Sequence, residues 1–272
     1  MSLPDLLSAA VLGVVEGVTE FLPVSSTGHL IIAGDWLGFT GDRAKTFEIV
    51  IQVGAILAIV WLYRERFLSV ARTAAREPAS RRFLTNLVLG FLPAAVLGLL
   101  LHHWIKAHLF TPLVVGIAFI VGGIAILLIE RWKPVATVEQ ATEISPKTAL
   151  GVGLAQTLAL IPGMSRSAAT IMGGYSLGLS RTAATEFSFF LAVPVLTAAA
   201  GLDLFKSLDV LSSADVPLFM VGLVVSFLSA FVVVKGFLKY VGHHSFSAFA
   251  WYRIGFGVLL LWVYGRSGFP AL

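Results

Sequence analysis

Two long apolar stretches, each broken in the middle, constrain the fold of this chain more than any other feature. They cover about residues 6–38 and 147–178, and their breaks read PVSSTG at 23–28 and PGMSRS at 162–167. Proline removes a helix hydrogen bond, glycine loosens the backbone and serine favours a helix start, so each stretch predicts two half-helices around a break. Irregular backbone at membrane depth is tolerated only inside protein or beside a wet cavity. We therefore expect two re-entrant helical hairpins.

Other apolar stretches are long enough to cross a hydrocarbon core, which takes about 20 helical residues. Only 12% of the residues are charged and the mean hydropathy is +0.91, which excludes a soluble globular domain. The predicted fold is an all-α polytopic membrane protein with six transmembrane helices and the two hairpins. The six predicted spans are residues 44–63, 84–101, 112–130, 184–202, 216–238 and 250–265.

The basic residues predict how the chain is oriented. Six arginines crowd the linker 64–82 between two apolar stretches, so the net charge of +4 indicates a cytoplasmic loop rather than nucleic-acid binding. This orientation puts the N-terminus and the first hairpin on the outer side.

Residues 1–12 lack the pattern of a secretory signal, so we expect no cleavage there. The chain has no cysteine, which excludes disulfides, thiolate metal sites and cysteine nucleophiles.

The sequence also contains an internal repeat. Sliding the chain on itself by about 140 residues superposes 22–27 on 161–166, and 44–47 on 184–187. Each half then has one hairpin and three crossings, and because three is odd the halves form an inverted repeat. In such folds the broken helices meet near the midplane, where helix N-termini attract anions. The halves, 1–133 and 147–272, would form a single membrane domain joined by a short cytoplasmic linker.

Two carboxylates stand just before the first break. Glu16 and Glu20 are four residues apart and share one helical face. Such a pair can hold a divalent cation, Mg²⁺ or alternatively Ca²⁺, and leave its other positions to water and phosphate oxygens. The alternative is a structural ion pair with an arginine of another helix. Charged groups in apolar segments are costly, and we favour the cation site.

Hydroxyl groups and an imidazole follow the first break. Ser25, Ser26 and Thr27 open the second half-helix, and His29 comes one turn after Ser26, so we expect these two side chains to be neighbours. They could act as nucleophile and general base, or His29 could itself attack phosphorus. We favour Ser26 as the nucleophile. The alternative is that the serines only cap a helix.

Arginine and serine occupy the second break. Arg166 lies between Ser165 and Ser167, and its planar fork of donors suits phosphate oxygens. It could instead be the counter-ion of Glu16 or Glu20, which would leave it in the same site. The polar residues Glu48, Gln52 and Glu186 could line the cavity, but we expect them to tie the hairpins to the spans.

Both breaks resemble the signature motifs of a known family. Residues 16–29 (EGVTEFLPVSSTGH) and 162–170 (PGMSRSAAT) are similar to motifs of the bacterial undecaprenyl pyrophosphate phosphatases of the bacitracin-resistance type, and the similarity covers nearly the whole chain. One difference is Ala168, where the family usually has glycine. The resemblance implies cation binding at Glu16 and Glu20, phosphate chemistry at Ser26 and His29, and phosphate binding at Arg166.

The resemblance further implies an activity and a location. The family removes the terminal phosphate of undecaprenyl pyrophosphate and so recycles the lipid carrier for peptidoglycan synthesis, with a divalent cation and a site that opens to the periplasmic side of the bacterial inner membrane. A lipid-phosphate flippase or secondary transporter with the same inverted repeat is the alternative. A phosphatidic-acid phosphatase of type 2 is set aside because neither Ser165-Arg166 nor Ser180-Arg181 is followed by the histidine that it needs. The other expected partners are membrane lipids, and the sequence is compatible with a homodimer.

Overall fold

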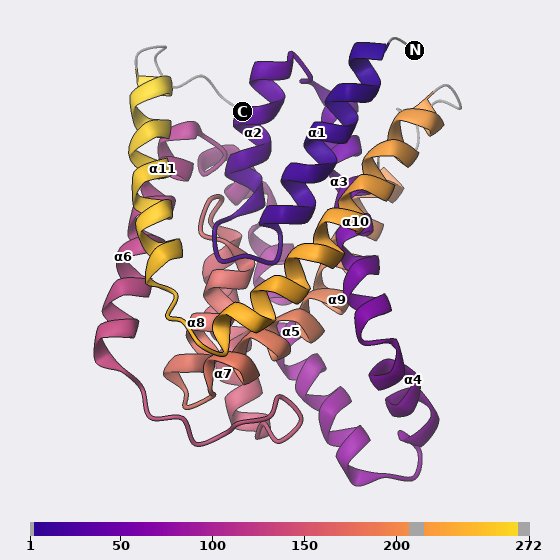
Figure 1. Cartoon of the computed structure of the whole chain (residues 1–272), viewed down its shortest axis with the longest axis vertical. Helices are drawn as coiled ribbons and strands as arrows, with labels where there is room; N and C mark the ends of the chain where they lie inside the picture. Colours follow the sequence, from indigo (N-terminus) through magenta and orange to yellow (C-terminus); the bar gives the residue numbers. More distant parts are fainter. Residues whose placement is uncertain (1–2, 207–214, 266–272) are drawn as a thin grey trace.

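The computed structural model describes residues 3–206 and 215–265, and this part of the chain is helical (Figure 1). Its only extended pairing is an isolated parallel bridge between Val138 and Leu179. The helices are α1 (Leu3–Thr19), α2 (Ser26–Leu37), α3 (Asp42–Leu62), α4 (Arg64–Thr73), α5 (Pro78–His108), α6 (Pro112–Trp132), α7 (Pro146–Gln156), the 3₁₀ turn η1 (Thr157–Leu160), α8 (Arg166–Ser176), α9 (Arg181–Lys206), α10 (Val216–Val241) and α11 (Ser247–Gly265).

The six predicted spans are confirmed as helices that are long and apolar enough to cross a membrane. They are Ala44–Leu62, Pro78–His108, Pro112–Trp132, Arg181–Phe205, Val216–Val241 and Ser247–Gly265. The largest difference is in α5, which begins and ends well outside the predicted 84–101. Pro78 favours a helix start at its N-terminus, and Lys106 and His108 complement the helix dipole in its last turn. The chain is thus a multi-pass membrane protein.

Large apolar side chains cover the outside of these helices. Leu100 of α5 and Val232 of α10 are 75% and 68% exposed, and many leucines and valines on α1, α6 and α11 are exposed as well. Contiguous apolar surface of this kind is rare on soluble monomers but matches a lipid environment.

Both broken stretches form a helix, a break and a second helix, as predicted. α1 has 17 residues, α2 has 12, and α7 and α8 have 11 each, so none exceeds about 26 Å, less than a hydrocarbon core of about 30 Å. In each pair the two helices pack against each other. Figure 1 shows α1 and α2 near the end of the molecule where α1 begins, and α7 and α8 toward the other end. That these pairs re-enter a bilayer, as an inverted repeat, stays a prediction.

The two sequence halves are interleaved rather than stacked. α1 and α3 of the first half pack against α10, α6 packs against α11, and α5 packs against α7. Near the segment that joins the two halves, Arg181 donates to both carboxylate oxygens of Glu130 at 3.0 and 2.6 Å. Glu130 also accepts from the backbone N–H of Phe246 at 2.8 Å. These bonds join the end of α6 to the starts of α9 and α11. The interleaving places the two breaks in the interior.

Candidate active site

The two breaks meet inside the protein. Arg166 at the start of α8 donates to Glu20 Oε1 over 3.3 Å, and both side chains are less than 10% exposed. Ser167 donates to the backbone carbonyl of Leu22 over 2.6 Å. The contact between Arg166 and Glu20 joins opposite charges. The bond from Ser167 fixes the backbone of the first break to α8, the helix that follows the second break. The predicted meeting of the breaks is therefore confirmed.

A buried arginine of α11 holds both breaks from a third side. Arg253 is fully buried, and it donates to the carbonyls of Pro23 at 3.3 Å, Gly163 at 3.1 Å and Ala118 at 3.1 Å. Gly122 makes room for it, because a Cβ atom there would collide with the guanidinium group. We did not single out Arg253 from the sequence. The available signal was a charge within an otherwise apolar span, which is costly without a partner.

The residues immediately before α2 and α8 share an unusual backbone conformation. Ser25 has φ 70° and Ser165 has φ 72°, a region that non-glycine residues rarely occupy and that is concentrated at functional sites. This pairing corrects the superposition from the sequence, which put Ser26 rather than Ser25 on Ser165. The second break is one residue longer after its proline, and Gly163, with φ 90°, accommodates the extra residue.

A cavity of about 170 Å³ lies between the breaks. Six of the residues predicted for the site line it: Glu20, Ser25, Ser26, Thr27, Ser165 and Arg166. Gln52 of α3 lines it too, whereas we expected a structural role for that side chain. Glu186 does have a structural contact, since Tyr63 donates to it over 3.3 Å. The cavity is large enough for a few water molecules or a phosphate group.

Ser26 is hydrogen-bonded to a carboxylate. Its hydroxyl donates to Glu20 Oε2 over 2.6 Å, and both residues are buried. The other oxygen of Glu20 accepts from Arg166, so one carboxylate joins the hydroxyl of the first break to the guanidinium of the second. A hydroxyl that donates to a buried carboxylate can lose its proton to that group when it attacks an electrophile.

His29 lies beside this group but has other partners, which corrects the expected Ser26–His29 pair. Its Nδ1 lies 2.7 Å from the carbonyl oxygen of Ser25, and its Nε2 lies 2.5 Å from the hydroxyl of Tyr252. The ring stacks on Phe256 with centroids 4.2 Å apart. Ser26 is the first residue of α2, where the side chain can turn back toward the break and Glu20. Helical spacing alone therefore misplaced the pair.

Glu16 is the second carboxylate predicted to bind a cation. It is 1% exposed, and its Oε1 has no hydrogen-bond partner in the described part of the chain. A buried oxygen of this kind is costly unless something supplies positive charge. The described residues contain no cluster of three or more acidic, histidine or cysteine side chains that could hold a metal ion. A cation at Glu16 would therefore need water or phosphate oxygens to complete its ligands, an arrangement that Mg²⁺ accepts.

Comparison with known proteins identifies the family of the chain. The family model described as bacitracin resistance protein BacA matches residues 9–259, a range that includes both breaks and Arg253. The chain belongs to the BacA family. Similar proteins named undecaprenyl-diphosphatase come from Dechloromonas aromatica, 55% identical over 262 residues and 96% of each chain, and from Nitrosospira multiformis, 54% identical over 256 residues and 94% of each chain. The undecaprenyl-diphosphatase of Methylococcus capsulatus is 52% identical over 261 residues and 96% of each chain. Membership of the BacA family thus confirms the resemblance drawn from the two motifs.

Proposed function

We propose that this BacA-family protein removes the terminal phosphate of undecaprenyl pyrophosphate, giving undecaprenyl phosphate and inorganic phosphate. This reaction recycles the lipid carrier for peptidoglycan synthesis and accounts for the association of the family with bacitracin resistance. The observation that carries the proposal is the 2.6 Å bond from Ser26 to Glu20, with Arg166 on the other oxygen of the same carboxylate. The undecaprenyl-diphosphatases named above support the choice of substrate. Nothing in the comparisons favours the flippase or transporter alternative.

In the first step Ser26 attacks the terminal phosphorus of the substrate. Its oxygen forms a bond to phosphorus, its proton passes to Glu20 Oε2, and the bond from phosphorus to the bridging oxygen breaks. Undecaprenyl phosphate leaves with the electron pair of that bond. A phosphate leaving group needs its charge neutralised more than it needs a proton, and Arg166 is placed to do this.

In the second step water attacks the phosphoserine. The oxygen of the water forms a bond to phosphorus, the bond from Ser26 to phosphorus breaks, and both protons of the water leave with inorganic phosphate. Ser26 recovers its proton from Glu20, which is then ready for another turnover. His29 keeps the Ser25 carbonyl in place throughout, so its role is to position the break that carries Ser26.

A divalent cation fits beside these groups. Glu16 would hold it, because Glu16 Oε1 has no hydrogen-bond partner among the described residues whereas both Glu20 oxygens are engaged. When bound, the cation would neutralise phosphate oxygens of the substrate. Ser25 and Thr27 at the start of α2 are placed to bind other phosphate oxygens. Ser165 also lines the cavity, but its hydroxyl is already bonded to the N–H of Ala168 and to Ser167.

We further propose that the site opens to the periplasmic side of the bacterial inner membrane. The arginine-rich linker 64–82 is then cytoplasmic, and α1 and α2 approach the site from the opposite side. Cysteine scanning tests this in the cysteine-free chain. Thr40 and Ala75 are suitable positions because both side chains are exposed.

Single cysteines at Thr40 and Ala75 flank α3 and should differ in intact cells. An impermeant thiol reagent should label the cysteine at Thr40, while the cysteine at Ala75 should react only after the cells are opened. Labelling of both cysteines in intact cells would contradict the proposed orientation.

The direct test of the function is phosphate release from undecaprenyl pyrophosphate by the purified protein. Release should be saturable, stop when a chelator is added, and resume when Mg²⁺ is restored. A folded protein that releases no phosphate in the presence of Mg²⁺ would contradict the proposal. Release that continues in the chelator would contradict only the role of the cation.

A further inference from the structure

A second and larger cavity lies at the junction of α3 and α4, against α10. Its volume is about 630 Å³, within the range of roughly 300–1,000 Å³ that is typical of ligand sites. Figure 1 places this junction between the breaks and the far end of α4, away from the first turn of α1. The lining residues are Trp61, Leu62, Tyr63, Arg64, Glu65, Arg66, Ser69, Phe231 and Lys235, and none of them belongs to the candidate active site.

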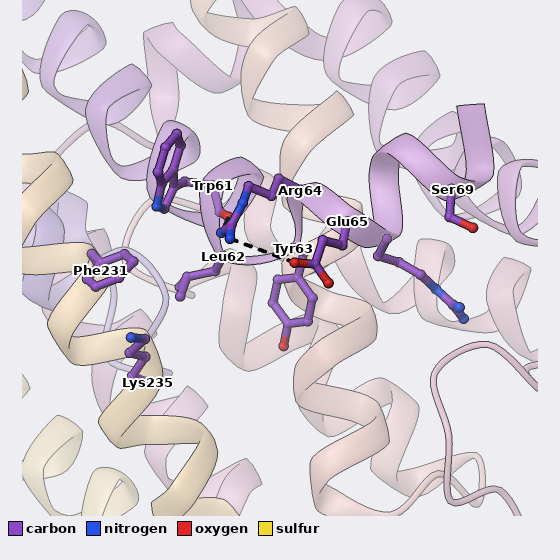
Figure 2. Close-up of a pocket in the computed structure, with 9 residues that line it drawn as sticks. Trp61, Leu62, Tyr63, Arg64, Glu65, Ser69, Phe231 and Lys235 are labelled. Carbon is purple, nitrogen blue, oxygen red and sulfur yellow. Dashed lines mark hydrogen bonds and ion pairs between the residues drawn. The ribbon is translucent and has the colours of Figure 1, made fainter. Parts of the chain in front are cut away.

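The lining of this cavity is positively charged. Arg64, Arg66 and Lys235 contribute three cations against the single carboxylate of Glu65. Glu65 is 91% exposed and lies 3.8 Å from Arg64, and an ion pair so open to solvent neutralises little. Figure 2 shows Arg64 at the α3–α4 junction and Lys235 on α10, with the Lys235 ammonium directed toward Phe231 on its own helix. Cations from two separate helices therefore line one concave surface, which favours an anionic ligand.

Aromatic rings support two of these cations. Arg64 lies over the ring of Trp61 at 5.1 Å from its centroid, and Lys235 lies over Phe231 at 4.3 Å. Such contacts hold a long basic side chain in place, so less conformational entropy is lost when it binds an anion. Trp61 is 55% exposed at the end of a membrane-spanning helix, the position where tryptophan is enriched at the boundary between lipid and water.

The cavity continues into apolar surface along both helices. Leu57 lies one turn before Trp61 on α3, and Leu228 and Val232 lie one turn before Phe231 and Lys235 on α10. These three aliphatic side chains are 44%, 56% and 68% exposed. A ligand with a charged head in the cavity could therefore rest its acyl chains on this strip. A free phosphate or nucleotide would make no use of it.

We propose that this cavity binds the headgroup of an anionic phospholipid, with its phosphodiester between Arg64 and Lys235 and its acyl chains along α3 and α10. The lipid belongs to the leaflet that faces the linker 64–82. Basic pockets between transmembrane helices on the cytoplasmic side suit such headgroups. The inference does not depend on the proposed phosphatase activity, because the two cavities share no residues.

Native mass spectrometry of the full-length protein in detergent tests the inference, with phosphatidylglycerol and phosphatidylcholine as probes. The test variant is Arg64→Gln with Lys235→Gln. The matched control is Arg72→Gln with Arg76→Gln, which removes the same charge from exposed arginines of the same linker outside the cavity. Wild type and control should retain phosphatidylglycerol in preference to phosphatidylcholine. The test variant should bind phosphatidylglycerol about 25-fold more weakly, about a factor of five for each cation.

Each of the following results would overturn the inference. Equal retention of the two lipids would remove the requirement for an anionic headgroup. An equal loss in the control would reduce the effect to general surface charge. Displacement of the lipid by millimolar inorganic phosphate would assign the site to a soluble anion. If the double variant does not fold, Lys235→Gln alone replaces it with an expected loss of about fivefold, and unchanged binding in that folded variant would also overturn the inference.

Discussion

The two breaks use the same backbone device for different purposes. Each places a serine with positive φ at the start of a short helix, and each gives a carbonyl to Arg253. At the second break Ser165 caps its own helix by accepting from the N–H of Ala168 at 3.2 Å. At the first break Ser25 makes no side-chain cap. In the proposed mechanism the N–H groups of α2 therefore bind phosphate, whereas the Ser165 cap uses one of those of α8 to stabilise the helix.

The side chains that follow the two serines extend this contrast. Ser26 directs a hydroxyl at Glu20, and Arg166 presents a cation to the same carboxylate. Arg166 is also held by the backbone carbonyl of Ser188 at 3.0 Å, and Thr170 and Ser188 share a 2.6 Å hydrogen bond beneath it. In the proposed mechanism the first break therefore supplies the reacting groups, while the second supplies a fixed positive charge. This difference predicts that matched substitutions in the two breaks have different effects.

The largest difference is expected between Ser26→Ala and Ser165→Ala. Ser26→Ala should lower kcat by about 10³-fold or more, because it removes the nucleophile but leaves the fold intact. Ser165→Ala should instead lower the free energy of unfolding by about 1 kcal/mol, the usual loss for a helix cap, with a small change in kcat. Steady-state phosphate release and thermal unfolding in detergent measure the two effects. Equal losses of kcat in both variants would contradict the different roles of Ser26 and Ser165.

A smaller loss is expected for Arg166→Lys. Lysine keeps the charge but cannot reproduce the donors that reach Glu20 and Ser188, so kcat/KM should fall by about 10²-fold to 10³-fold. Arg181→Lys is the control, because Arg181 makes a similar paired contact with Glu130 away from the site. The control should unfold more easily while its kcat stays near that of the wild type. Full activity in Arg166→Lys would reduce Arg166 to a structural counter-ion.

Glu16→Gln should have the smallest effect at saturating cation. It removes a buried carboxylate oxygen without a hydrogen-bond partner among the described residues, so the Mg²⁺ concentration for half-maximal activity should rise by at least about tenfold. Titration of activity with Mg²⁺ measures this shift. Glu48→Gln is the control, because Glu48 acts on Glu16 through its charge. The Mg²⁺ concentration for half-maximal activity should rise less in Glu48→Gln than in Glu16→Gln. Normal rates at low Mg²⁺ in Glu16→Gln would remove the proposed cation site.

The spans and the position of the site could be predicted because both depend on local sequence. Long apolar stretches allow few structures in a membrane, and a break within one must be shielded by protein. The prolines and serines at 23–28 and 162–167 therefore located the site before its geometry was known. Glu20 and Arg166 could be predicted because a charged side chain in an apolar segment is costly unless it has a partner or a function.

The partners within the site could not be predicted because they depend on how distant segments pack. Helical spacing placed Ser26 beside His29, but Glu20 lies closer once the break turns the chain. His29 is instead held by Tyr252, which is 223 positions away. Arg253 bonds to both breaks from the last span, and nothing in its neighbouring sequence indicates those contacts. The sequence comparison also missed the extra residue in the second break. Aligning Pro23 with Pro162 placed Ser26 on Ser165, whereas the structure pairs Ser25 with Ser165.

The measurement that most directly tests the role of the first break is rapid quenching of the protein with undecaprenyl pyrophosphate labelled in its terminal phosphate. Quenching at low temperature with acid should trap an acid-stable phosphoserine, which peptide mapping places at Ser26. Ser26→Ala should carry no label. Acid-labile label that persists in Ser26→Ala would move the nucleophile to His29, and a wild-type protein that turns over without label at any quench time would assign the attack to water.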